Sequence, residues 1–162
     1  MNPVSVLDYR YGTEEMRNIF RADSYLEFLL EIEATLAEVQ ESKGIIPKKT
    51  SQYIRKGTTS VSRKRVEEIE SEINHDIMAV IKALEEKVGD AGKWIHFGAT
   101  SYDIVDTARS LQHKKGLALI EKAIDNLIQS LSILAKKHKK TVMVGRTHGQ
   151  WATPITFGLK MA

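Results

Sequence analysis

Apolar side chains recur every three or four positions along most of the chain, a spacing that predicts helices with one buried face. The first such stretch begins at Ser24 and stops before Gly44 and Pro47. A short helical turn is predicted over residues 50–54, and a break follows at residues 57–60. The first stretch carries a mostly apolar stripe made of Leu26, Leu29, Leu30, Glu33, Leu36, Ala37 and Gln40.

A second helical period runs from Val66 to Leu84 and reaches Gly89. His75 and Asp76 lie inside it, either within the helix or at a local break. A loop punctuated by glycines then contains Trp94 and His96. We expect a domain boundary near residue 100, which gives an N-terminal helical domain over residues 1–100 and a second region over residues 101–162.

The longest predicted helix starts at Thr100 or Ser101, either of which can cap it, and Asp103 in its first turn suits the positive end of the helix dipole. Helical spacing of apolar residues continues to about His138 without a proline. Such a rod would be roughly 55 Å long at 1.5 Å per residue. The remainder of this chain is too short to cover its apolar face, so partner helices are expected.

A last helix is predicted to start at Thr153 and Pro154, because proline fits the first turn of a helix. The sequence ITFGLKMA then stops without a capping residue. We therefore expect the sequence to be the N-terminal part of a longer protein whose bundle of helices continues beyond residue 162.

Composition supports a folded, helical, soluble protein. Of 162 residues, 42% are hydrophobic and 28% charged, which excludes disorder. The absence of cysteine excludes disulfides and thiol catalysis and suits a cytoplasmic location. Neither a membrane span nor a secretion signal is visible, so no membrane partner is expected. The net charge is only +3, and the lysines at residues 136–140 suit a helix C-terminus better than a nucleic-acid site.

Three polar clusters are candidates for chemistry: residues 74–76, 96–106 and 145–150. In the third, His148 lies beside Gly149, where it could transfer a proton or serve only as a turn residue. Thr100 and Ser101 could bind an anion or simply cap their helix. Neither metal-ligand spacing nor a phosphate-binding glycine loop is present, so no metal and no cofactor are predicted.

Three segments carry a family resemblance when they are taken in this order: NHDIMAV, KWIHFGATSYDIVDTA and VGRTHGQWATPITFGLK. Together they resemble the adenylosuccinate lyase family of the fumarase/aspartase superfamily, and the opening DYRYGTEEM is similar as well. The resemblance implies an all-α fold with a bundle of long helices. It also implies a purine-biosynthesis enzyme that eliminates fumarate from adenylosuccinate, leaving AMP, and from the succinylated aminoimidazole carboxamide ribotide.

The resemblance further implies roles for individual residues. His148 would be the general acid, and His75 would orient or assist this step. Binding residues would include Thr100 and Ser101, which would hold the carboxylate of the succinyl group. The other implied binding residues are Arg10 and Tyr11 on the nucleotide, Asn74 and Asp76 beside His75, and His96 as a neighbour of the site.

By the same resemblance, the complete protein would be a homotetramer whose active sites combine residues of three subunits. Its general base would lie beyond residue 162, so we expect the isolated chain to be inactive. Argininosuccinate lyase or another superfamily member remains an alternative, because Thr100, Ser101 and His148 fit several of them. A helical interaction fragment without catalysis is the alternative from a different class, and a nucleic-acid binder ranks below it.

Overall fold

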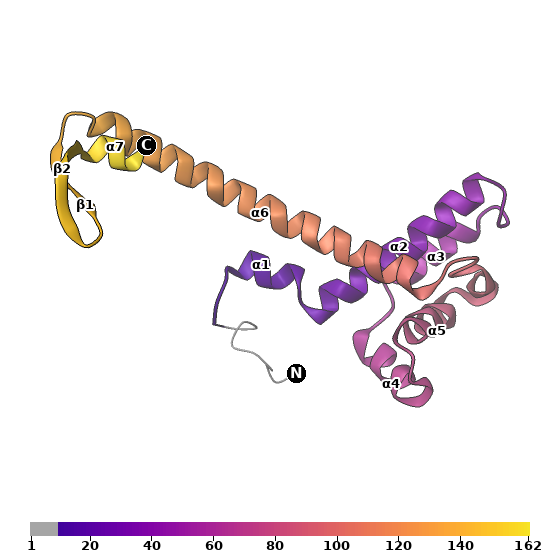
Figure 1. Ribbon diagram of the computed structural model, residues 1–162. Helices are drawn as coiled ribbons and strands as arrows, with labels where there is room; N and C mark the ends of the chain where they lie inside the picture. Colours follow the sequence, from indigo (N-terminus) through magenta and orange to yellow (C-terminus); the bar gives the residue numbers. More distant parts are fainter. Residues whose placement is uncertain (1–9) are drawn as a thin grey trace. The chain divides into compact units, whose positions relative to one another are not determined.

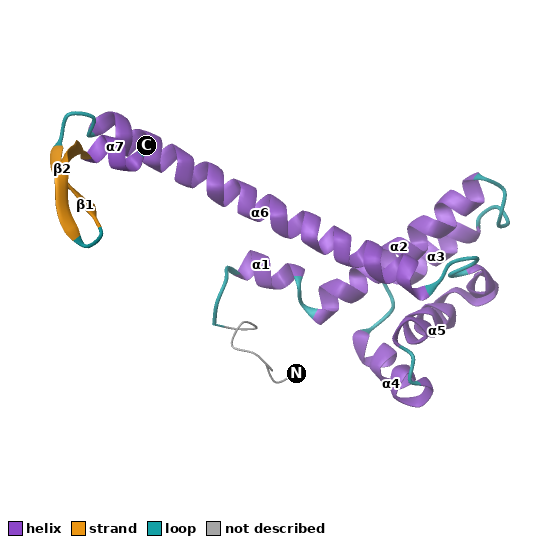
Figure 2. Ribbon diagram, viewed as in Figure 1, coloured by secondary structure: helices purple, strands orange, loops and turns teal. Residues whose placement is uncertain are grey.

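A computed structural model describes residues 10–162 and consists of helices with one small β-hairpin, in agreement with the predicted all-α class (Figures 1 and 2). The chain divides into two compact units, the first ending at Gly116 and the second beginning at Leu117. The division falls inside a long helix, α6. The elements in order are α1 (Glu14–Ile19), α2 (Ala22–Ser42), α3 (Thr50–Thr58), α4 (Arg63–Ile73), α5 (Asp76–Val88), a 3₁₀ helix η2 (Gly89–Trp94), α6 (Ser101–Lys137), β1 (Val142–Thr147), β2 (Gln150–Thr156) and α7 (Phe157–Met161).

The core of the first unit lies where α2, α3 and α5 pack together. The predicted first helix is confirmed as α2, whose apolar stripe is largely buried. Ile54 of α3 and Leu84 of α5 are completely buried in this core, and Ile104 joins them from the start of α6. Burial of these aliphatic side chains is the main stabilising contribution to the unit.

The predicted helical period from Val66 to Leu84 is interrupted at the local break that the sequence allowed. Asn74 ends α4 in a left-handed conformation with φ 53°, which asparagine tolerates better than most residues. His75 then caps α5, because its Nδ1 accepts a hydrogen bond from the backbone N–H of Met78 at 3.3 Å. The break turns the chain and leaves the polar cluster at a helix N-terminus.

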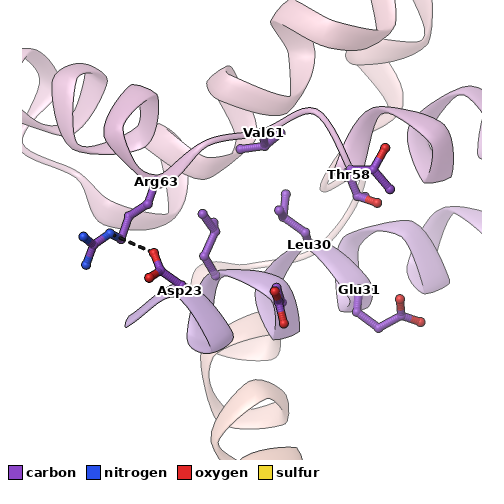
Figure 3. Close-up of a pocket in the computed structure, with 9 residues that line it drawn as sticks. Asp23, Leu30, Glu31, Thr58, Val61 and Arg63 are labelled. Atoms are coloured by element: carbon purple, nitrogen blue, oxygen red, sulfur yellow. Dashed lines mark ion pairs between the residues drawn. The ribbon is translucent and has the colours of Figure 1, made fainter. Parts of the chain in front are cut away.

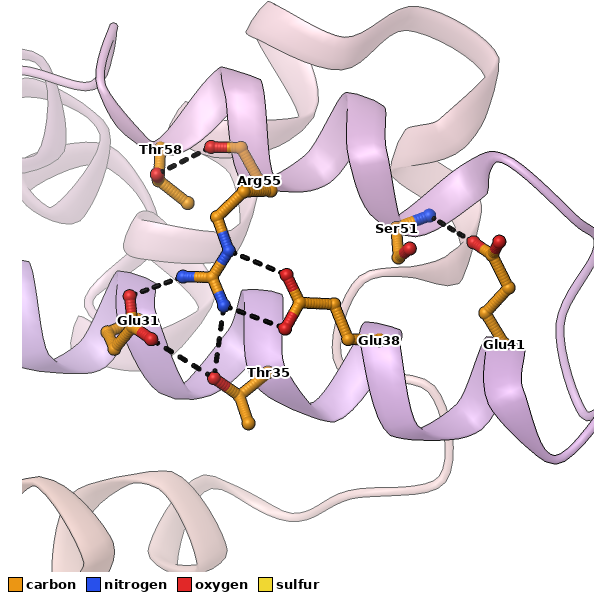
Figure 4. Close-up of polar contacts among 7 residues, drawn as sticks. All are labelled: Glu31, Thr35, Glu38, Glu41, Ser51, Arg55 and Thr58. Carbon is orange, nitrogen blue, oxygen red and sulfur yellow. Dashed lines mark hydrogen bonds and ion pairs between the residues drawn. The ribbon is translucent and has the colours of Figure 1, made fainter.

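Charged side chains join α3 to α2 on the solvent side of the core (Figure 4). The Arg55 guanidinium donates to both carboxylate oxygens of Glu38, at 2.8 and 3.0 Å, and also pairs with Glu31. Nearby, the Glu41 carboxylate accepts from the backbone N–H groups of Lys49 and Ser51, each at 2.8 Å. These bonds lower the pKa of Glu41 and of Glu38 below the ordinary value of 4.5.

We expect the free energy of unfolding to fall as the pH drops below about 4.5, because a carboxylate whose pKa is lower in the folded state stabilises it only while ionised. Glu41→Gln keeps one acceptor for two N–H donors, so it should reduce the loss of stability on acidification. Urea unfolding at about pH 6 and pH 3.5 measures the difference. An equal loss in the wild type and in Glu41→Gln would contradict this account.

The second unit holds the hairpin, in which β1 and β2 pair antiparallel with a bulge between Val144 and Arg146. The predicted helix start at Thr153 and Pro154 is wrong, because both residues lie on β2. A two-stranded hairpin tolerates proline, since each strand is an edge strand. The helix α7 begins later, at Phe157, where Thr156 Oγ1 accepts from the N–H of Leu159 at 3.1 Å.

Helix α7 packs on the C-terminal end of α6 (Figure 1). Its Gly158 is required by close approach, since a Cβ there would lie 2.6 Å from the carbonyl oxygen of Ala135. The Phe157 ring meets the His138 ring edge-on at 5.1 Å, so His138 is half-buried rather than fully exposed. These contacts fix where the chain enters and leaves the hairpin.

The predicted long helix is confirmed as α6, which spans 37 residues. Ile104, Val105 and Ala108 are buried in the first unit, whereas the apolar residues after Gly116 are mostly exposed. The exposed ones are Leu117, Ile120, Ile124, Leu127, Ile128 and Ile133. Partner helices that cover them stay a prediction, as does the domain division at residue 100. No helix in residues 10–162 is long and apolar enough to cross a membrane.

Candidate active site

The cluster of residues 74–76 lies at the exposed N-terminus of α5. His75 uses its Nδ1 for the helix cap, so Nε2 is the ring nitrogen left for a ligand. The Asp76 carboxylate accepts from the N–H of Ile77 at 2.8 Å and lies 3.6 Å from His75 Nδ1. Asn74 presents its side chain from the turn between α4 and α5. The structure therefore exposes all three predicted residues at one turn.

The second cluster opens α6. Thr100 precedes the helix and Ser101 is its first residue, as predicted. The Asp103 carboxylate accepts from the N–H of Thr100 at 2.8 Å, and the N–H of Asp103 donates back to the Thr100 carbonyl at 3.0 Å. Asp103 thus supplies the cap, and no described residue hydrogen-bonds the hydroxyls of Thr100 and Ser101. Hydroxyls at the positive end of a helix dipole suit a carboxylate ligand.

The hydroxyl of Tyr25 of α2 is influenced by charges from both of these clusters' helices. The pKa of the Tyr25 hydroxyl is raised, mainly by partial burial. The carboxylates Asp76 and Asp106 raise it further, whereas Arg109 lowers it. Asp76 belongs to α5, whereas Asp106 and Arg109 belong to the second and third turns of α6. Tyr25 is therefore within electrostatic reach of both the His75 turn and the beginning of α6.

His96, predicted as a neighbour of the site, is held by a residue that sequence reasoning did not select. Glu33 of α2 is only 1% exposed, and His96 is only 13% exposed. Both carboxylate oxygens accept from His96, Oε1 from ring Nδ1 at 2.6 Å and Oε2 from the backbone N–H at 3.1 Å. The sequence did contain a signal for this pairing: Glu33 lies in a mostly apolar stripe, and a buried charge needs a hydrogen-bonding partner.

A second α2 side chain holds the next residue of the same loop. Gln40 Nε2 donates to the carbonyl oxygen of Phe97 at 2.6 Å. The loop bends sharply on either side of this bond, with φ 59° at His96 and 70° at Gly98. Glu33 and Gln40 thus fix the loop that leads from η2 to Thr100 and Ser101.

His148 stands at the tip of the hairpin in the second unit. With Gly149 it forms the two-residue turn, with φ 50° and 74° respectively, values typical of a type I′ turn. Its Nδ1 contacts the Thr147 hydroxyl at 2.9 Å, and the residue is exposed. The turn therefore presents the imidazole to solvent, where it is accessible to a substrate.

Arg10 and Tyr11 lie ahead of α1 and are exposed. The backbone at Tyr11 and Gly12 is held by Arg17, whose guanidinium donates to the carbonyl oxygens of Tyr11 at 3.3 Å and Gly12 at 2.7 Å. The structure brings His75, Thr100, Ser101 and His96 into the first unit, together with Arg10 and Tyr11. No described contact joins Arg10 or Tyr11 to the other candidate residues.

The surface of the first unit has several hollows. The one in Figure 3 has a volume of about 430 Å³ and contains the ion pair between Asp23 and Arg63 at 3.0 Å; none of the predicted site residues lines it. Another, of about 640 Å³, lies beside the loop and is lined by Gln40, Phe97 and Asp103 among mostly apolar side chains. Of these two hollows, the second adjoins the N-terminus of α6.

Known proteins resemble this chain along nearly its whole length. The family model described as lyase matches residues 8–162. The chain is 50% identical over 161 residues to adenylosuccinate lyase of Pyrococcus abyssi and 48% identical over 162 residues to that of Methanocaldococcus jannaschii. These alignments cover 98% of the chain, but only 36% and 35% of the two relatives.

A solved structure agrees with these relatives. Fumarate lyase from Mesorhizobium sp. BNC1 superimposes with a TM-score of 0.85 and 37% identity, over 93% of this chain and 37% of that one. The chain thus spans a little over one third of the length of the proteins it resembles.

Proposed function

The chain belongs to the lyase family, and from that membership we propose that the protein containing it is an adenylosuccinate lyase. It would eliminate fumarate from adenylosuccinate, leaving AMP, and act in the same way on the succinylated aminoimidazole carboxamide ribotide. The observation that carries the proposal is that the hydroxyls of Thr100 and Ser101 have no described hydrogen-bond partner at the start of α6, in a chain 50% identical over 161 residues to an adenylosuccinate lyase.

The elimination breaks a bond between carbon and nitrogen and makes a carbon–carbon double bond. A base removes the proton beside a carboxylate, the electron pair forms the double bond, and an acid protonates the departing nitrogen. His148 would be that acid, since its exposed imidazole can carry a proton near neutral pH. The base would come from sequence that follows residue 162, and no cofactor is needed.

Charge develops on the carboxylate beside the reacting carbon, and preorganised donors stabilise it. Thr100 and Ser101 would supply hydroxyl donors at the positive end of α6. His75 would orient the reacting groups through its free Nε2, flanked by Asn74 and Asp76. Two further parts of the site are proposed by resemblance: Arg10 and Tyr11 on the nucleotide, and His96 as a neighbour of the site.

Assembly completes the proposal. The exposed apolar residues of α6 after Gly116 suit a bundle with helices of other subunits, and we propose a homotetramer. A cytoplasmic location would place the enzyme with its small-molecule substrate. Nucleic acid and membrane are not partners in this proposal.

The proposal is tested with the complete protein and three substrates: adenylosuccinate, the succinylated ribotide and argininosuccinate. We expect fumarate from the first two only. Release from argininosuccinate alone would move the chain to a sister lyase. No release from any of them would contradict the proposed elimination.

Replacing Thr100 and Ser101 together by alanine should raise the KM for adenylosuccinate at least 10-fold. A hydrogen bond to a charged group contributes about 1.5–3 kcal/mol, which corresponds to roughly 10- to 100-fold per bond. Steady-state kinetics of the complete protein measure the change. Ser110→Ala is the matched control, because the Ser110 hydroxyl lies on the same helix but bonds the carbonyl oxygen of Asp106. An equal KM in the double variant and the control would exclude the assigned role.

A further inference from the structure

Glu33 is the most deeply buried acidic side chain in the described part of the chain, and the proposed function does not use it. It lies on α2 among buried aliphatic side chains such as Leu29, Leu30 and Ala37. Removing a carboxylate from water is costly unless hydrogen bonds replace its hydration. Both replacements come from one residue, His96, through its ring and its backbone N–H.

The two hydrogen bonds determine the state of the His96 ring. An ionised carboxylate only accepts, so when Glu33 is ionised Nδ1 carries the proton in the contact with Oε1 at 2.6 Å. No described residue hydrogen-bonds Nε2. In the neutral ring, Nε2 is then the unprotonated nitrogen, and it is the one free to meet a substrate.

The same pair also fixes the backbone. His96 has φ 59°, an unusual conformation for a residue other than glycine, and its N–H is held by Glu33. Four residues later the chain reaches Thr100, so a shift at His96 would displace the start of α6. The buried Glu33 carboxylate therefore holds both the ring of His96 and the backbone of the loop that leads to Thr100.

We propose that Glu33 is a positioning residue of the active site, which holds His96 with Nδ1 protonated and keeps Nε2 available to the bound substrate. The proposal rests on the proposed function, because it takes His96 as a neighbour of the lyase substrate. Burial is the larger effect and raises the pKa of the Glu33 carboxyl above 4.5, although the hydrogen bonds from His96 oppose the rise by favouring the ionised form.

Glu33→Gln tests the proposal because it preserves size and one acceptor. The backbone N–H of His96 can only donate, so it should take the glutamine oxygen and leave the amide NH₂ facing the ring. Nδ1 must then accept, and the ring proton moves to Nε2. This exchange follows from the hydrogen bonds alone, so the kinetic measurements below are needed to distinguish a positioning role from a purely structural one.

The first measurement is solid-state ¹⁵N NMR of the complete protein labelled in histidine, with His96→Gln used to assign the signal. We expect a protonated Nδ1 in the wild type and a protonated Nε2 in Glu33→Gln. An unchanged tautomer in the variant, or a wild type already protonated only at Nε2, would overturn the proposal.

The second measurement is the kcat/KM for adenylosuccinate. Loss of the hydrogen-bond partner that orients a metal-ligating histidine typically costs 10- to 100-fold, and we expect a loss of the same size when Glu33→Gln removes the orientation of His96. Glu38→Gln is the control. Glu38 lies on α2, as Glu33 does, but its carboxylate accepts from Arg55 of α3 and does not contact the loop.

A double-mutant cycle identifies the route of the effect. If Glu33 acts through His96, adding Glu33→Gln to His96→Gln should change kcat/KM less than twofold. A Glu33→Gln enzyme within twofold of the wild type, or an equal loss in both backgrounds, would refute the positioning role. A wild type without fumarate release would instead reject the proposed function, while the NMR spectrum still decides whether Glu33 sets the tautomer.

Discussion

Replacing His148 by glutamine in the complete protein should lower the kcat for adenylosuccinate by about 100- to 10,000-fold, the usual contribution of a general acid. Glutamine cannot protonate the departing nitrogen, so the barrier to breaking the carbon–nitrogen bond rises. Binding should change less, because the carboxylate and the nucleotide are assigned to other residues. Steady-state kinetics with fumarate as the measured product separate kcat from KM.

The hairpin turn requires a matched variant. His148 has φ 50°, a conformation that asparagine adopts more readily than glutamine, so His148→Asn keeps the turn while removing the acid. Both variants should lose the same activity. His113→Gln, which changes an exposed histidine of α6, should stay near the wild-type rate. Retained turnover in His148→Asn would show that the imidazole is not the acid.

Leu84→Ala should lower the free energy of unfolding by about 2–5 kcal/mol, the range for a buried leucine. The Leu84 side chain is fully buried and faces Gly57, where a Cβ would lie 3.1 Å from its Cδ1. The helices α3 and α5 approach closely here, so the neighbours have little freedom to fill the cavity. Urea unfolding measures the loss.

Lys82→Ala is the control on the same helix, since Lys82 is exposed and should change stability by less than about 0.5 kcal/mol. A loss below 1 kcal/mol in Leu84→Ala would mean that the packing of α3 on α5 contributes less than the structure indicates.

Much of the helical fold was predictable because its signal is local. The apolar stripe of α2 and the start of α6 follow from which faces are buried, and the break at Asn74 follows from residues that favour turns and caps. The hairpin was not predicted. A threonine followed by Pro154 is equally compatible with a helix start and an edge strand, and pairing with Val144 decides between them.

The candidate site was predictable where polar residues interrupt the apolar pattern, as at His75, Thr100 and His148. What the sequence could not show is which of these groups are already engaged within the fold. The Nδ1 of His75 caps α5, and Asp103 rather than a hydroxyl caps α6. The pairing of Glu33 with His96 joins residues 63 positions apart, and no local pattern contains that information.

The most direct test of the proposed lyase activity runs the reaction backwards in deuterated water. The complete protein is incubated with AMP and fumarate, and the product is examined by mass spectrometry and proton NMR. Addition across the double bond predicts adenylosuccinate with one solvent deuteron on the carbon next to the one that bonds nitrogen. If no adenylosuccinate forms, or if it forms without deuterium at that carbon, the proposed elimination is contradicted.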